Sequence, residues 1–160
     1  MYLLTTSRKP GRKTRRFAKV LARFFNWRYV NRGKLSLEDL SNLSEAFWII
    51  SEVKGNPAIL TLYERGERKL EMSFTLSNVK KLKMDDSAVV FQGKLPFDPV
   101  IFGAIPQTKA GMKLARKVDF RKKVVVKGNE WLFFYDDDKM IFKLRVLRIT
   151  QNLRQSPRTP

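Results

Sequence analysis

Two stretches of the chain follow one plan of short strands separated by tight turns, and this plan constrains the fold more than any other feature. Apolar and polar residues alternate in both, which places one face of each strand in the core and the other in water. The expected strands cover 47–53, 58–63 and 70–76 in the first stretch and 123–127, 131–135 and 140–149 in the second. Because the letters VKGN stand at the first turn of each, at 53–56 and 126–129, we interpret the stretches as copies of one duplicated unit.

The segment from about 12 to 25 has a helical period instead. Its apolar residues recur at i, i+3, i+4 and i+7 and predict one stripe that packs on a core: Phe17, Val20, Leu21 and Phe24. Four bases share another face, an arc of about 60° at ~100° per residue, with Arg15 beside it. They are Arg12, Arg16, Lys19 and Arg23. We expect one face of this helix to pack and the other to face outward.

Other segments add short strands and further helices. Strand-like runs are expected at 2–6 and 27–30, on either side of the basic helix. Ser36 precedes two acids, a pattern that caps a helix start, and this helix is expected to end near Leu43. Another short helix is expected near 108–117.

These elements predict an α/β (α+β) fold, in which helices pack on a mixed sheet. The chain has 160 residues, of which 43% are hydrophobic, enough to bury the core of one domain. We assign that domain to 1–150, with pseudo-repeated halves of about 1–84 and 85–150. A flexible tail is expected over 151–160, which has no periodicity.

Two residue types are missing, and their absence limits the chemistry. Without Cys, the chain has no disulfides, thiolate metal ligands or Cys nucleophiles, and it fits a reducing cytoplasm. Without His, it lacks the commonest general base and metal ligand. Asp136, Asp137 and Asp138 are interpreted as a turn rather than a metal site. We therefore expect a non-catalytic protein without metal, cofactor or small-molecule substrate. No apolar run approaches the ~20 residues that span a bilayer, so no membrane partner is expected.

Positive charge is concentrated at the N-terminus. The formal net charge is +18, and residues 1–34 contain 11 Lys or Arg and no Asp or Glu. Lys13-Thr14 resembles the end of an NTPase phosphate loop, but the upstream glycine pattern is missing. A transit peptide is disfavoured because no cleavage site follows. An ordinary solvated helix would carry acids at i+4 spacing, so a surface that binds nucleic acid is the preferred interpretation.

The predicted RNA contacts come chiefly from this N-terminal region. They are Arg8, Lys9, Arg12, Lys13, Arg15, Arg16, Lys19, Arg23, Arg28 and Arg32. A second basic cluster adds Arg116, Lys117, Arg121 and Lys122, while the second half shows no obvious copy of the basic helix. Trp27, Tyr29 and Trp131 have polar neighbours and are considered for base stacking, although most aromatic residues are expected in the core.

The start of the chain resembles the signature of the Brix-domain family, in particular its small archaeal members. The stretch LLTTSRKPGRKTRRFAKVLARFFNWRYVNRGKLSLEDL combines an ITTSR-like strand, a basic helix, a W-R-Y-x-N-R-G strand and turn, and a second helix. The match is close over residues 1 to about 60, including Lys54-Gly55-Asn56-Pro57. From about residue 85 onward only the plan agrees.

The resemblance implies a role in ribosome biogenesis through ribosomal RNA, pre-rRNA or guide RNA, together with ribosome-assembly proteins. It also implies that each half is similar to the anticodon-binding domain of class IIa aminoacyl-tRNA synthetases. Three alternatives stay open: a component of an RNA-processing or RNA-modifying enzyme, a general RNA chaperone without ribosomal specificity, and a peripheral membrane protein. The last is disfavoured because the core needs the apolar stripe of the first helix.

Overall fold

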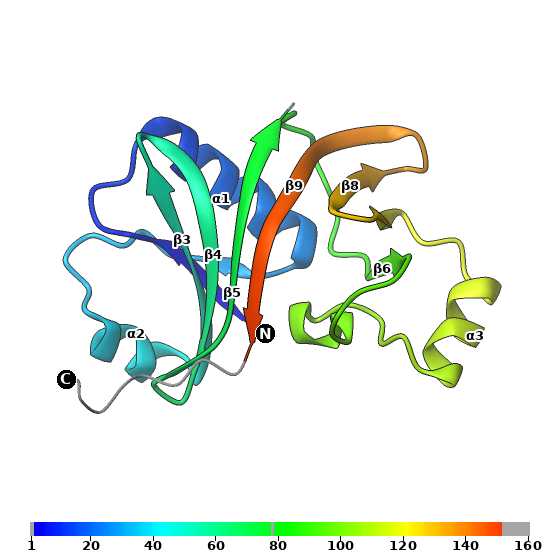
Figure 1. The fold of residues 1–160 in the computed structure, drawn as a ribbon, viewed down its shortest axis with the longest axis horizontal. Helices are drawn as coiled ribbons and strands as arrows, with labels where there is room; N and C mark the ends of the chain where they lie inside the picture. Colours follow the sequence, from blue (N-terminus) through cyan, green and yellow to red (C-terminus); the bar gives the residue numbers. More distant parts are fainter. Residues whose placement is uncertain (1, 78, 152–160) are drawn as a thin grey trace. The chain divides into compact units, whose positions relative to one another are not determined.

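A computed structural model describes residues 2–77 and 79–151, which form two compact units (Figure 1). The N-terminal unit comprises 2–19, 28–75 and 146–151, and the C-terminal unit comprises 20–27 and the described residues of 76–145. The elements are β1 (Leu3–Thr6), α1 (Arg12–Phe25), β2 (Arg28–Tyr29), α2 (Leu37–Leu43), β3 (Ala46–Val53), β4 (Asn56–Glu64), β5 (Glu67–Ser77), β6 (Val89–Gln92), the 3₁₀ helix η1 (Pro99–Phe102), α3 (Lys109–Lys117), β7 (Lys122–Lys127), β8 (Glu130–Tyr135) and β9 (Lys139–Gln151).

The predicted helices and strands are all present, with small differences at their ends. Ser36 caps α2 through a capping box with Asp39, as its sequence predicts. Pro57 lies inside β4 rather than in the preceding turn. β6 and η1 are not predicted by the sequence. Of the expected tail at 151–160, Gln151 ends β9, and the remainder lies outside the described residues.

In the N-terminal unit the strand order is β2-β1-β3-β4-β5, followed by β9. β1 pairs in parallel with β2 and β3, and β3, β4 and β5 form an antiparallel meander. Helices cover opposite faces of this sheet. Phe17 of α1 contacts Phe74 of β5, with 5.8 Å between ring centroids. Leu40 of α2 packs on the other face, against Phe47 and Ile49.

In the C-terminal unit the order is β9-β8-β7-β6, with β6 parallel to β7 and an antiparallel meander through β7, β8 and β9. Its core is built of aromatic rings on one face of the sheet. Phe24 of α1 contacts Phe133 at 5.2 Å, and Phe25 stacks on Phe91 and Phe102 at 6.1 and 5.1 Å. The last turns of α1 therefore supply core side chains to this unit.

The two halves of the chain share one strand order and direction, as predicted. Each begins with a strand (β1 or β6), continues through a helix (α1 or α3) to a parallel strand (β3 or β7), and ends in an antiparallel meander. The first half also contains β2 and α2. A β-bulge near the end of the middle strand occurs in both, between Leu62 and Tyr63 in β4 and between Phe133 and Phe134 in β8.

The matching letters VKGN are not structurally equivalent, although both lie at hairpins. In the first hairpin Lys54 and Gly55 form the turn, with φ values of 51° and 79°. In the second the turn residues are Gly128 and Asn129, and Lys127 still belongs to β7. The plan of the repeat is therefore real, while the letters that suggested it are offset by one residue.

Candidate nucleic-acid interface

Nine of the predicted RNA contacts are exposed side chains on the β1–α1 loop, α1 and β2. They are Arg8, Lys9, Arg12, Lys13, Arg15, Arg16, Lys19, Arg23 and Arg28. The buried stripe of α1 includes Phe17 and Phe24, so the predicted division of this helix into a packed and an outward face is confirmed. Within 2–77 and 79–151, none of the nine cations forms an ion pair with an acid.

The start of α1 is hydrogen-bonded to an acidic side chain of strand β3. The Glu52 carboxylate of β3 accepts hydrogen bonds from the Gly11 backbone N–H, at 3.1 and 3.3 Å, and from the Thr14 hydroxyl. The bond from Thr14, and then that from Gly11, lower the pKa of Glu52. α1 has no acid in its first turn, so Glu52 provides the negative charge that the positive end of a helix favours.

The loop before α1 contains a backbone conformation that is uncommon for its residue type. Lys9 has φ 53°, in the left-handed region, and precedes Pro10, a position that normally favours extended backbone. The loop is tied to β3 by a 2.9 Å bond from the Ser7 N–H to the Ile50 carbonyl. A defined turn between β1 and α1 thus carries the exposed cations Arg8 and Lys9.

Arg32 does not belong to the exposed surface, which corrects its predicted RNA contact. It is 8% exposed, and its guanidinium donates to the Thr6 carbonyl at 3.0 Å and to the Leu35 carbonyl at 2.7 Å. Burial, and then the nearby charge of Arg8, lower its pKa. Its role is structural, because it satisfies carbonyl groups at the end of β1 and before α2.

Lys122 is also a structural residue, contrary to its prediction as an RNA contact. Its side chain is fully buried, and Nζ donates to the Arg23 carbonyl at 3.0 Å and to Asn26 Oδ1 at 2.8 Å. Burial lowers the pKa of Lys122 to about 8. It places a cation at the last turn of α1, where the helix dipole favours positive charge.

Arg121 is exposed, but its charge is already paired with acidic side chains. Its guanidinium pairs with Asp85 at 2.6 Å and Asp136 at 2.7 Å and lies 4.8 Å from the Tyr135 ring centroid. Asp136 and Asp137 lie at the β8–β9 turn, as predicted. Within the described residues, no group of three acids, Cys or His could hold a metal ion. Of the second predicted cluster, only Arg116 and Lys117 are exposed and outside any ion pair found in those residues.

The structure excludes base stacking on both tryptophans that were considered for it. Trp27 is 7% exposed and donates from Nε1 to the Phe102 carbonyl at 2.9 Å, and Trp131 is 2% exposed. Both belong to the aromatic core of the C-terminal unit. Tyr29 is half-buried, and the Lys19 ammonium lies 5.9 Å from its ring centroid. Tyr29 is the one of the three that stays accessible.

The helix predicted near 108–117 is present as α3, and it is a second basic helix, a counterpart of α1 that sequence reasoning did not recognise. It occupies the place in the second half that α1 occupies in the first, and it carries exposed bases at i, i+4, i+7 and i+8. These are Lys109, Lys113, Arg116 and Lys117. The helix contains no acid. The spacing is visible in the sequence, but the neighbouring prolines and glycines obscure it.

Comparison with known proteins gives close relatives. A probable Brix domain-containing ribosomal biogenesis protein of Archaeoglobus fulgidus is 78% identical over 154 residues, covering 96% of this chain and 100% of that protein. A protein of the same description from Methanothermobacter thermautotrophicus is 48% identical over 92 residues, covering 54% of this chain and 58% of that protein. No model of a known protein family matches the chain.

Solved structures with the same fold include an archaeal Imp4-like protein. It has a TM-score of 0.64 and 26% identity, covering 93% of this chain and 99% of that chain. A probable ribosomal biogenesis protein from Aeropyrum pernix K1 has a TM-score of 0.68, covering 97% of this chain and 100% of that one. At 19% identity the latter likeness concerns the fold alone. The predicted mixed sheet with packed helices agrees with both. No helix in the described part of the chain has the length and apolar character needed to cross a membrane.

Proposed function

Because the chain belongs to the family of Brix domain-containing ribosomal biogenesis proteins, we propose that it takes part in ribosome biogenesis by binding pre-rRNA through the β1–α1 loop and α1. It acts in the cytoplasm as an assembly factor and catalyses no reaction. Each half uses the plan of a class IIa synthetase anticodon-binding domain. Guide RNA and ribosome-assembly proteins are further partners in this proposal.

One observation carries this proposal: the nine exposed cations of the β1–α1 loop, α1 and β2 have no acid to pair with among the described residues. Some bases elsewhere in the molecule have acidic partners, as Lys143 has Glu130 at 3.2 Å and Arg65 has Glu45 at 2.7 Å. Keeping like charges together costs stability at i,i+4 spacing. An arrangement of this kind is suited to a polyanion, whose phosphates replace the missing acids.

The expected chemistry is backbone recognition. Arg side chains can donate two parallel hydrogen bonds to one phosphate, and Lys adds compact charge. Such contacts supply affinity and position the protein, whereas selectivity comes from RNA shape or from unpaired bases. Tyr29, whose ring centroid lies 5.9 Å from the Lys19 ammonium, is an accessible aromatic side chain for one such base.

The experiment replaces four bases of α1 with Gln: Arg12, Arg16, Lys19 and Arg23. Gln is a good helix former, so the fold is kept. Losing about four phosphate contacts flattens the slope of log K against log salt by about 3, at ~0.7 per contact with single strands. Binding of the full-length protein to ribosomal RNA fragments is measured over a salt series.

A matched control removes the same charge from other exposed positions: Lys80, Lys81, Lys83 and Lys94, each changed to Gln. If net charge alone attracts RNA, the two variants lose equal affinity. The proposal requires the α1 variant to lose much more. Wild-type affinity and an unchanged salt slope in a folded α1 variant would show that this surface is merely solvated.

A further inference from the structure

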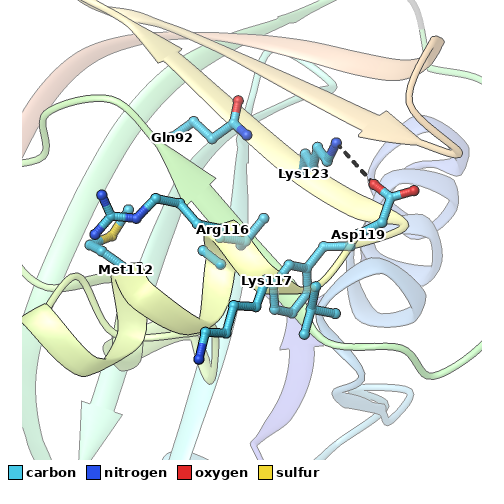
Figure 2. Close-up of a pocket in the computed structure, with 10 residues that line it drawn as sticks. Gln92, Met112, Arg116, Lys117, Asp119 and Lys123 are labelled. Atoms are coloured by element: carbon cyan, nitrogen blue, oxygen red, sulfur yellow. Dashed lines mark ion pairs between the residues drawn. The ribbon is translucent and has the colours of Figure 1, made fainter.

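An open pocket lies between α3 and the outer face of β6 and β7 in the C-terminal unit (Figure 2). Its volume is about 710 Å³. Its lining includes Val90 and Gln92 of β6, Met112, Ala115 and Arg116 of α3, and Lys123 of β7. Val90 of β6 is paired with Lys123 of β7, so both project from the face opposite the aromatic core.

α3 is fixed at its N-terminal end and contributes little to the core along its length. Thr108 caps it by accepting a hydrogen bond from the Gly111 N–H at 3.1 Å. Gly111, the only buried residue of α3, has no room for a side chain, because a Cβ would lie 1.9 Å from the Pro106 carbonyl oxygen. The preceding Gln107 side chain donates to the Gly93 carbonyl after β6 at 2.9 Å. A hollow remains under the middle of the helix, where protein interiors are normally filled.

The pocket combines an apolar floor with a positive rim. Val90 and Phe120 are buried, and Met112 and Ala115 are half-buried. Lys123 is neutralised by Asp137 at 2.8 Å and Asp119 at 3.7 Å. The two exposed cations of the rim, Arg116 and Lys117, have no ion pair within 2–77 and 79–151. Figure 2 shows the amide of Gln92 projecting from β6 on the strand side of the same pocket.

We propose that this pocket holds one unpaired nucleotide of a bound RNA strand. The base of this nucleotide lies against Val90, Met112 and Phe120. Its hydrogen-bonding edge meets the Gln92 amide, which both donates and accepts hydrogen bonds. The phosphates on either side of the nucleotide lie at Arg116 and Lys117. The volume is in the range of pockets that enclose small ligands. The inference rests on the proposed RNA-binding function and adds to it a second contact that reads unpaired bases.

The test fills the pocket without changing charge. Ala115→Phe occupies the hollow, and Ala110→Phe, at an exposed α3 position outside the lining, is the matched control. The full-length proteins are titrated with a short single-stranded RNA and with an RNA duplex, which offers no unpaired base. We expect Ala115→Phe to bind the single strand about tenfold more weakly, the size of one lost base-stacking contact. Duplex binding and the Ala110→Phe variant stay at the wild-type level.

A second readout locates the base directly. The single strand is made with 4-thiouridine, photo-crosslinked to the wild-type protein and mapped by mass spectrometry, with crosslinks expected at Met112 or Phe120. If the wild-type protein binds RNA but Ala115→Phe binds the single strand equally well, or crosslinks map outside the pocket, the inference is wrong and the proposed function stands. If the wild-type protein binds neither RNA, both fail. Displacement by an acidic peptide but not by uridine oligonucleotides would assign the pocket to a protein and overturn the inference.

Discussion

α1 and α3 stand at the same place in the two halves and carry the same kind of charge, yet they are packed differently. Both connect a strand to its parallel neighbour, and neither contains an acid. α1 buries a full stripe of side chains, including Phe17, Leu21 and Phe24. α3 buries only Gly111, and Leu114 is 45% exposed.

This difference distinguishes two contributions of a basic helix: the packing of its apolar side chains in the core, and the binding of a ligand by its exposed bases. In α1 the bases are attached to an element that both units need for their cores. In α3 the bases are attached to a short helix with a hollow beneath it, so its side chains are free to meet a ligand. Duplication of one plan has thus produced one helix with a structural role and one whose surface is its main contribution.

The largest expected effect is on α1. Phe17→Ala removes a ring that is 1% exposed and should lower the free energy of unfolding by about 3–5 kcal/mol through the cavity it leaves. Met112→Ala, the corresponding change on α3, should cost about 1 kcal/mol or less, because Met112 is half-buried at an open pocket. Urea denaturation measures both. Equal losses would show that α3 is as much part of the core as α1.

A second test concerns the last turn of α1 and its contact with Lys122. The folded pKa of about 8 is below the ordinary 10.5, so between these values the unfolded chain binds more protons than the folded one. The free energy of unfolding should therefore rise with pH across this window, by up to about 3 kcal/mol. Below pH 8 both states are protonated, and the cost of burying the charge is fully present.

Lys122→Met supplies the control for this pH dependence. Without the amine, the rise between pH 8 and 10.5 should disappear, while other titrating groups contribute equally to both proteins. Stability curves of the two proteins that run parallel through this window would show that Lys122 titrates at its ordinary pKa.

A smaller effect is expected at the anchored end of α3. Gly111→Ala forces a methyl group against the Pro106 carbonyl and should cost about 1–3 kcal/mol, typical of overpacking. The start of the helix must then move away from Pro106. Hydrogen exchange should become faster in 109–117 and stay unchanged in α1. An equal loss of protection from hydrogen exchange in α1 would contradict the view that α3 is anchored independently of α1.

Much of the fold could be predicted because local pattern and tertiary structure agree. α1 matches its predicted bounds, since its apolar period and its packed stripe are the same residues. β6 was missed because three of its four residues, Val89, Val90 and Phe91, are buried, and a short strand covered on both faces shows no alternation. The repeat was identified from VKGN, which is offset by one residue, so the strand plan rather than the letters justified it.

The candidate surface was predictable only in part. Exposure of a basic side chain depends on which carbonyl groups lie near it after folding, and these belong to distant segments. Arg32 meets the Thr6 carbonyl, and Lys122 meets Arg23 and Asn26. Nothing in a run of bases distinguishes such residues from their solvated neighbours. The pocket under α3 could not be predicted at all, because it is the space that the side chains of α3, β6 and β7 leave unfilled after packing, and no sequence pattern reports such a space.

The two contacts that hold the ends of α1 have a consequence for the order in which the chain folds during synthesis. Thr14 and Glu52 are 38 residues apart, and Asn26 and Lys122 are 96 residues apart. A 14-residue helix with like charges at i,i+4 spacing is marginal by itself. We therefore expect the segment 12–25 to emerge from the ribosome as an unstructured polycation and to become a helix only when the strands that follow it have been made.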